Sequence, residues 1–270
     1  MTSHKPQLGA DTQYPESYDP GLLVSIPRSE GRASLSISAP MYGWDIWTGY
    51  ELSWLNAKGK PQVAMAEFRV NASSTSIVES KSFKLYLNSL NQEKYASVEE
   101  LLVCLQKDLS SGFGGDVVIR LASLEEAAGG VLQGFEGVCL DELDVTCADY
   151  QPNASLLRTE SVRVHHETLF SHLLKTNCPV TGQPDWASVA IAYSGNKIDR
   201  EGLLQYLVSY RQHQDFHENC VESLFANILQ RCRPDNLSVY ARYTRRGGLD
   251  INPFRSTQKT EPTICRIARQ

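Results

Sequence analysis

The chain has 270 residues, 21% of them charged, and a net charge of −5. This length can bury a core as one large domain or two small ones, and the mild acidity argues against a broad nucleic-acid-binding surface, which needs a basic excess. No apolar run is long enough to span a membrane, and the polar N-terminal segment lacks the apolar region of a secretory signal.

The first part of the chain predicts a strand hairpin, then helices, then more strands. IWTGYELSWL and PQVAMAEFRV alternate in polarity around the turn at Lys58-Gly59, which indicates two paired strands. Residues 82–111 carry helical spacing, with Ser97 as an N-cap. The β-branched and aromatic segments GGDVVIRLASL and VLQGFEGVCL are then expected to be strands.

The second part predicts the same order of elements. VRVHHETLFSHLL and WASVAIAYS are expected to be extended, Asp199 to cap a helix over 200–212, and 216–232 to form a second helix. LSVYARYTRRGG closes the pattern as a strand with a basic end. Strands at the ends and helices in the middle of each part predict an α+β class with antiparallel sheets.

The two parts also resemble each other. SWLNAKGKPQVAMAEFRV, from Ser53, and TNCPVTGQPDWASVAIAYS, from Thr176, both pass from a polar turn through Gly-x-Pro into alternating apolar residues, and each precedes a similar helical segment. This indicates an internal duplication. We expect an N-terminal arm over 1–44, a first half over 45–150 and a second half over 151–270.

Cys178 stands among turn-forming residues in the segment TNCPVTGQPDW. A loop centred on Gly182 would fold Asp185 back toward this thiol and give a nucleophile and a proton donor in one site. The alternative is a turn with a chance cysteine, a small buried residue, and an aspartate that caps a helix.

Three further segments suggest ligand contacts. His217-Glu218, in DFHENC, offers a proton relay and a carboxylate, although a solvated helix start explains it equally well; it lacks the second histidine of a HEXXH zinc site. Glu79-Ser80-Lys81 is either an ordinary helix cap or part of a phosphate site. Arg246-Gly247 is either an exposed turn or an anion contact.

Together, ESKSFKLYLNS, NCPVTGQPDW, DFHENC and YTRRGGLDINP resemble, in this order, the family of NADPH-dependent 7-cyano-7-deazaguanine reductases in its long, duplicated form. These enzymes reduce a nitrile to a primary amine in the biosynthesis of queuosine, a modified tRNA base. The resemblance implies tandem tunnelling-fold (T-fold) units, antiparallel sheets with paired helices on one face, that assemble into a homodimer or a higher homo-oligomer.

The resemblance also implies roles for individual residues. Cys178 would be the nucleophile, Asp185 the general acid and His217 an assistant in proton transfer. The residues expected to bind the deazaguanine are Ile77, Val78, Glu79, His217 and Glu218. Those expected to hold NADPH are Ser80, Lys81, Arg246 and Gly247. The first half has no thiol at the position of Cys178, so one complete site is expected to need both halves.

The seven cysteines are scattered and include no CxxC, which favours a reducing, cytoplasmic compartment over a disulfide framework and predicts no metal site. Two alternatives remain at this stage. A GTP cyclohydrolase-like hydrolase of the same fold would need a zinc site of Cys and His, for which the histidine spacing offers no convincing ligand set. A non-catalytic purine-binding module would bind the nitrile without oxidising NADPH. We expect no direct contact of the protein with nucleic acid or membrane.

Overall fold

The computed structural model describes residues 15, 17–37, 39–128, 132–263 and 266–270. The described residues form two compact units. The first takes its residues from 1–30, 47–130 and 245–249, and the second from 31–46, 131–244 and 250–270. Within the described residues, no helix is both long and apolar enough to cross a membrane.

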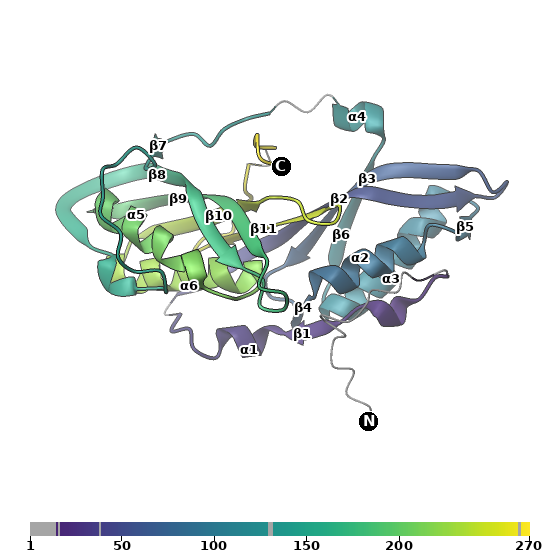
Figure 1. Ribbon diagram of the computed structural model, residues 1–270, viewed down its shortest axis with the longest axis horizontal. Helices are drawn as coiled ribbons and strands as arrows, with labels where there is room; N and C mark the ends of the chain where they lie inside the picture. Colours follow the sequence, from purple (N-terminus) through teal and green to yellow (C-terminus); the bar gives the residue numbers. More distant parts are fainter. Residues whose placement is uncertain (1–14, 16, 38, 129–131, 264–265) are drawn as a thin grey trace. The chain divides into compact units, whose positions relative to one another are not determined.

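The first unit contains a group of neighbouring sheet strands and two long helices (Figure 1). Its strand order is β6-β3-β2, with β2 at Tyr42–Asn56, β3 at Pro61–Asn71 and β6 at Val117–Ala122. Helices α2 (Ser80–Ser89) and α3 (Val98–Phe113) follow the hairpin. The shorter elements are η1 (Pro20–Leu22), β1 (Ser25–Pro27), α1 (Arg28–Arg32), β4 (Ser76–Val78), β5 (Lys94–Tyr95) and α4 (Leu124–Ala128).

The predicted hairpin and helix cap of the first unit are confirmed. β2 and β3 are neighbours in the sheet, and the Ser97 hydroxyl accepts a hydrogen bond from the backbone N–H of Glu100 at 3.3 Å. The helical spacing over 82–111 is divided between the two helices α2 and α3, because the chain turns and pairs as β5 between them. Aromatic rings fill the core: Trp47 and Phe68 meet Phe83 edge-on at centroid distances of 5.1 and 5.2 Å.

The second unit has a sheet in the order β11-β10-β9-β8-β7. β8 (Thr159–Asn177), β9 (Pro184–Ile198), β10 (Asn236–Tyr243) and β11 (Leu249–Ser256) pair antiparallel, whereas β7 (Val138–Cys139) joins β8 in parallel. The helices are α5 (Arg200–Ser209) and α6 (His217–Cys232), with 3-10 turns η2 (Ala154–Leu156) and η3 (Tyr210–Gln212).

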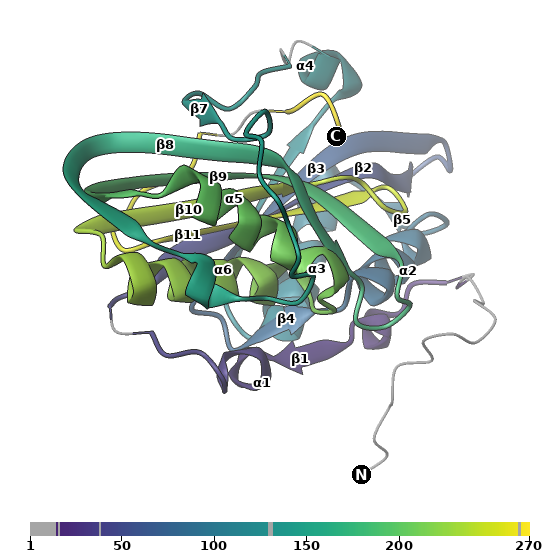
Figure 2. The ribbon, with the colours of Figure 1, turned by 60° about the vertical axis from the view of Figure 1, so that its left-hand side comes forward.

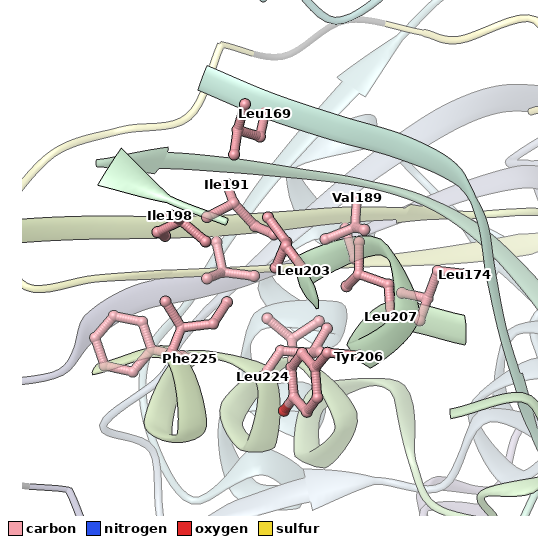
Figure 3. Close-up of a cluster of buried hydrophobic side chains, with 14 of the residues drawn as sticks. Leu169, Leu174, Val189, Ile191, Ile198, Leu203, Tyr206, Leu207, Leu224 and Phe225 are labelled. Carbon is pink, nitrogen blue, oxygen red and sulfur yellow. The ribbon is translucent and has the colours of Figure 1, made fainter. Parts of the chain in front are cut away.

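Helices α5 and α6 cover one face of this sheet (Figure 2). Figure 3 shows Leu203 and Phe225 on the helices pointing at Val189 and Ile191 on the strands. These four side chains are fully buried. Burying one such side chain stabilises a fold by about 1.5–3 kcal/mol, so this cluster dominates the stability of the unit. The alternating burial of β9 leaves its other side chains on the opposite face of the sheet.

Two segments differ from the structure expected from the sequence. VLQGFEGVCL was predicted to be a strand, but in its described part only Val138–Cys139 is assigned to one. Strand β11 was not predicted, although all eight of its residues are buried. Its sequence includes Asp250, Asn252 and Arg255, which are unusual in a buried strand. Tertiary contacts compensate: the Arg255 guanidinium lies 2.8 Å from the carboxylate of Asp45 and 2.8 Å from that of Glu222.

The helices repeat between the units. α2 and α5 both have 10 residues, and α3 and α6 both have 16. Acidic side chains cap α2 and α5, at Glu79 and Asp199 respectively. These caps align Glu79 with Asp199. The α+β class with mainly antiparallel sheets is confirmed.

Candidate functional site

The hairpin between β8 and β9 presents Cys178. Thr176 pairs with Asp185 and Asn177 with Pro184 at the end of the ladder, and Cys178 is the first residue beyond it. Its backbone N–H donates to the Gln183 carbonyl at 2.9 Å, and its carbonyl accepts from Gly182 at 3.0 Å. Gly182 has a φ of 69°, which a residue with a side chain adopts only with strain. Two main-chain bonds therefore fix the backbone of this buried cysteine.

The start of α6 is tied to the same hairpin through backbone bonds. The Asn177 N–H donates to the His213 carbonyl at 2.8 Å, and the Asp215 N–H donates to the Asn177 carbonyl at 3.2 Å. His217, two residues later, is the first residue of the helix. Its Nε2 lies 3.2 Å from Oδ2 of Asp185, a carboxylate that is only 3% exposed. Asp185 and His217, two of the site candidates from the sequence, are thus in contact within the second unit.

The His217 ring is stacked on a tyrosine. The rings of His217 and Tyr243 are 3.7 Å apart between centroids and only 4° from parallel. Tyr243 is fully buried, and burial raises the pKa of its phenol well above the ordinary value, so the ring is neutral at physiological pH. The stack fixes the plane of the imidazole, and the contact with Asp185 fixes the position of its Nε2 atom. Tyr243 was not singled out from the sequence, although it lies in the motif YTRRGGLDINP.

Cys220 and Glu218 lie beside this group. Burial raises the pKa of the Cys220 thiol well above its ordinary value, and the carboxylates of Asp215, Asp185 and Glu218 raise it further. Cys220 therefore stays protonated at neutral pH and is a poor nucleophile. Glu218 is 2% exposed and belongs to the first turn of α6, whose N-cap residue provides no side-chain hydrogen bond. A helix start of this kind favours a negative charge nearby.

The first unit holds the remaining candidates. Ile77 and Val78 are buried on β4, where they pair with β1, and Glu79 follows them. The Glu79 carboxylate accepts hydrogen bonds from the backbone N–H groups of Lys81 at 2.9 Å and Ser82 at 2.7 Å. The cap reading of Glu79 is therefore correct. It does not exclude a ligand, because a carboxylate has about four acceptor positions and the two N–H bonds use two of them.

Arg246 and Gly247 form the turn between β10 and β11. Backbone bonds of 2.9 and 3.1 Å join Arg246 and Leu249, and Gly247 and Gly248 have φ values of 57° and 79°. Positive φ at both central positions is the geometry of a type I′ hairpin turn. A Cβ on Gly247 would lie 3.9 Å from the side chain of Lys84 on α2.

The same unit therefore brings this turn close to the helix that begins at Ser80 and Lys81. Arg245 lies over the ring of Tyr50 at 4.2 Å and adds a positive charge, whereas the Lys84 ammonium is paired with the Glu51 carboxylate. This donor set, with a helix N-terminus, suits the phosphates of a nucleotide cofactor.

Comparison with known proteins identifies two family models on the chain. "Nitrile reductase, 7-cyano-7-deazaguanine-reductase N-term" matches residues 14–121, and "QueF-like protein" matches residues 184–262. Relatives named NADPH-dependent 7-cyano-7-deazaguanine reductase include one from Saccharophagus degradans, 54% identical over 98% of this chain and 98% of its own. Another, from Hydrogenovibrio crunogenus, is 50% identical over 100% of this chain and 98% of its own.

Proposed function

Since this chain belongs to the family of NADPH-dependent 7-cyano-7-deazaguanine reductases, we propose that Cys178 is its nucleophile and Asp185 its general acid. The protein is an oxidoreductase, its cofactor is NADPH and its substrate is 7-cyano-7-deazaguanine, in queuosine biosynthesis. The hydrolase and the purine-binding module lose their basis, because neither is favoured by any of these relatives.

The first chemical step uses the second unit. The Cys178 thiol gives its proton to the Asp185 carboxylate, and the thiolate adds to the nitrile carbon. Asp185 then passes that proton to the nitrile nitrogen, which leaves a neutral covalent thioimide. A thioimide accepts hydride more readily than a nitrile does. The observation that supports this assignment most is the buried pair of Asp185 and His217. Asp185 lies in the strand ladder that ends next to Cys178, and His217 begins the helix that backbone bonds tie to the same hairpin.

The later steps release the amine. NADPH supplies one hydride in each of two reductions, because conversion of a nitrile to a primary amine takes four electrons. His217, held against Asp185 and Tyr243, assists the proton transfers to nitrogen. The carbon–sulfur bond breaks between the two reductions, and Cys178 recovers its proton.

Most of the binding roles in this proposal belong to residues of the first unit. NADPH is held by Ser80, Lys81, Arg246 and Gly247. Ser80 and Lys81 contribute the start of α2, Lys81 and Arg246 contribute cationic side chains, and Gly247 contributes a turn without a side chain. Ile77 and Val78 contact the base. Glu79 and Glu218 accept its adjacent N–H groups. Sites of this kind strongly reject a base that lacks the donors, because buried carboxylates would then lose their partners.

We also propose tandem T-fold units, a cytoplasmic location and a homo-oligomeric state of at least a dimer. The matched helix lengths support the duplicated fold, and the scattered cysteines without a CxxC are consistent with a reducing compartment. Light scattering on purified protein measures the oligomeric state, and a monomer at micromolar concentration would contradict this part of the proposal.

The decisive experiment mixes the full chain with 7-cyano-7-deazaguanine and NADPH and follows the absorbance of the reduced nicotinamide. We expect two NADPH oxidised per nitrile consumed. Mass spectrometry without NADPH should show the thioimide on the wild type and on a Cys147→Ser control, and none on Cys178→Ala. An adduct that persists in Cys178→Ala would assign the nucleophile to another residue.

A further inference from the structure

Three side chains with metal-binding atoms meet at the edge of the sheet of the second unit, apart from the residues discussed above. The Cys139 thiol, the Asp141 carboxylate and an imidazole nitrogen of His172 all lie within 4.8 Å of one another. Cys139 is exposed, and the other two are half-buried. The sequence spacing did not reveal this group, because Asp141 and His172 are brought together by pairing between β7 and β8 rather than by proximity in the chain.

The backbone holds the two segments in register. β7 runs parallel to β8, with Cys139 opposite Phe170, and the Leu140 N–H donates to the Phe170 carbonyl at 2.9 Å. Leu169 belongs to the core under the helices, so the alternation of the strand directs Phe170 and His172 to the opposite face. Ser188 on β9, between core residues Ala187 and Val189, faces the same way.

Hydrogen bonds orient two of the three side chains. The Ser171 hydroxyl donates to Oδ1 of Asp141 at 2.6 Å, and the His172 backbone N–H donates to Oδ2 at 3.0 Å. Nδ1 of His172 lies 2.7 Å from the Ser188 hydroxyl, which leaves Nε2 available to a ligand. Metal-binding histidines commonly have their second nitrogen held in this way, and the outer partner fixes the orientation of the ring.

We propose that Cys139, Asp141 and His172 bind a zinc ion that joins β7 to the edge of the sheet. Thiolate, imidazole and carboxylate are the ligands that zinc prefers, with bonds of about 2.0–2.3 Å. Rotation of the exposed Cys139 side chain brings its sulfur to that distance, and water completes the tetrahedron on the open side. The ion is not part of the reductase chemistry, which needs no metal. Its role is to attach the segment 138–141 to β8.

The test titrates Zn²⁺ into the metal-free full chain against a chromophoric chelator, and repeats the titration with Co²⁺. We expect one zinc per chain and the near-ultraviolet thiolate-to-cobalt absorption. Cys139→Ser and His172→Ala should weaken zinc binding by more than tenfold, and Ser188→Ala by about 10–100-fold as an outer partner. Cys147→Ser and His165→Ala, an exposed histidine on the same strand, should bind as the wild type does.

Two comparisons separate this site from the reaction centre. Zinc should raise the melting temperature of the wild type and of Cys178→Ala alike, and should leave that of Cys139→Ser unchanged. Unchanged affinity in Cys139→Ser would refute the proposal. So would the absence of stoichiometric binding, or binding that disappears only in Cys178→Ala, which would assign the ion to the hairpin of Cys178.

Discussion

Replacement of Tyr243 tests whether the stacked ring positions His217. Tyr243→Leu removes a parallel stack at 3.7 Å, and such aromatic pairs contribute about 0.5–1.5 kcal/mol beyond their buried area. If that energy holds the imidazole in its working plane, its loss slows the first turnover by about two- to tenfold, at 1.36 kcal/mol per tenfold. Tyr243→Phe keeps the ring and removes only the hydroxyl. Among the described residues, no atom lies at a distance and angle that would make a hydrogen bond with this hydroxyl. The Phe variant should therefore react at nearly the wild-type rate.

The assay is rapid mixing of enzyme and nitrile with NADPH under single-turnover conditions, with urea unfolding of each variant as the stability control. A double-mutant cycle with His217→Ala isolates the coupling. Tyr243→Leu should have little further effect on the rate when His217 is absent. The reasoning fails if Tyr243→Phe is as slow as Tyr243→Leu, because the hydroxyl would then be the functional group. It also fails if the two single effects simply add.

Three further predictions concern the acidic caps, the buried ion pair and the second buried thiol. Glu79→Ala should destabilise the protein by about 0.5–2 kcal/mol through loss of the α2 cap and raise KM for the nitrile. Glu79→Gln should keep most of the stability but still raise KM. An unchanged KM in Glu79→Gln would mean that this residue only caps the helix. Glu222→Ala removes one of the two carboxylates beside the buried Arg255 guanidinium and leaves Asp45. It should lower the free energy of unfolding by up to about 3 kcal/mol, the low end of the cost of breaking a buried ion pair, against no measurable change for exposed Glu142→Ala. The raised pKa of Cys220 means that the folded protein holds a proton that the unfolded chain loses above pH about 8.5, so stability should fall above that pH by up to about 1.4 kcal/mol per unit. Urea unfolding from pH 8 to 9.5 should show a shallower fall in Cys220→Ala, and an equal slope would contradict the shift.

Local patterns predicted much of the fold. Alternating polarity identified the hairpin strands β2, β3, β8 and β9, and capping residues identified the starts of α3 and α5. β11 escaped because its buried Asp250, Asn252 and Arg255 are polar, and they are acceptable only with partners far away in the sequence. No local rule anticipates such partners.

The candidate site shows the same limit. The sequence indicated Cys178, Asp185, His217 and Glu218 through motifs, and the structure brings Asp185 and His217 into contact. Tyr243 was not anticipated, because a stack between residues on β10 and α6 depends on how the helix crosses the sheet. The sequence could not decide whether Glu79 caps α2 or binds a ligand, because both roles require the same side chain at the same helix start.

The attachment of the reactive hairpin to the loop before α6 has a practical consequence for protein engineering. The bonds that join Cys178 to Gly182 and Gln183, and Asn177 to His213 and Asp215, run between peptide groups. One side chain of the loop takes part as well, because the Thr181 hydroxyl accepts from the Gln183 N–H at 3.4 Å. Side chains at positions 179 and 180 can therefore be randomised in a library without loss of these bonds, whereas position 181 should keep Thr or Ser. Insertions or deletions in 178–183 or 213–215 would shift the peptide groups themselves. A search for variants that accept other nitriles should accordingly vary side-chain identity and hold loop length constant.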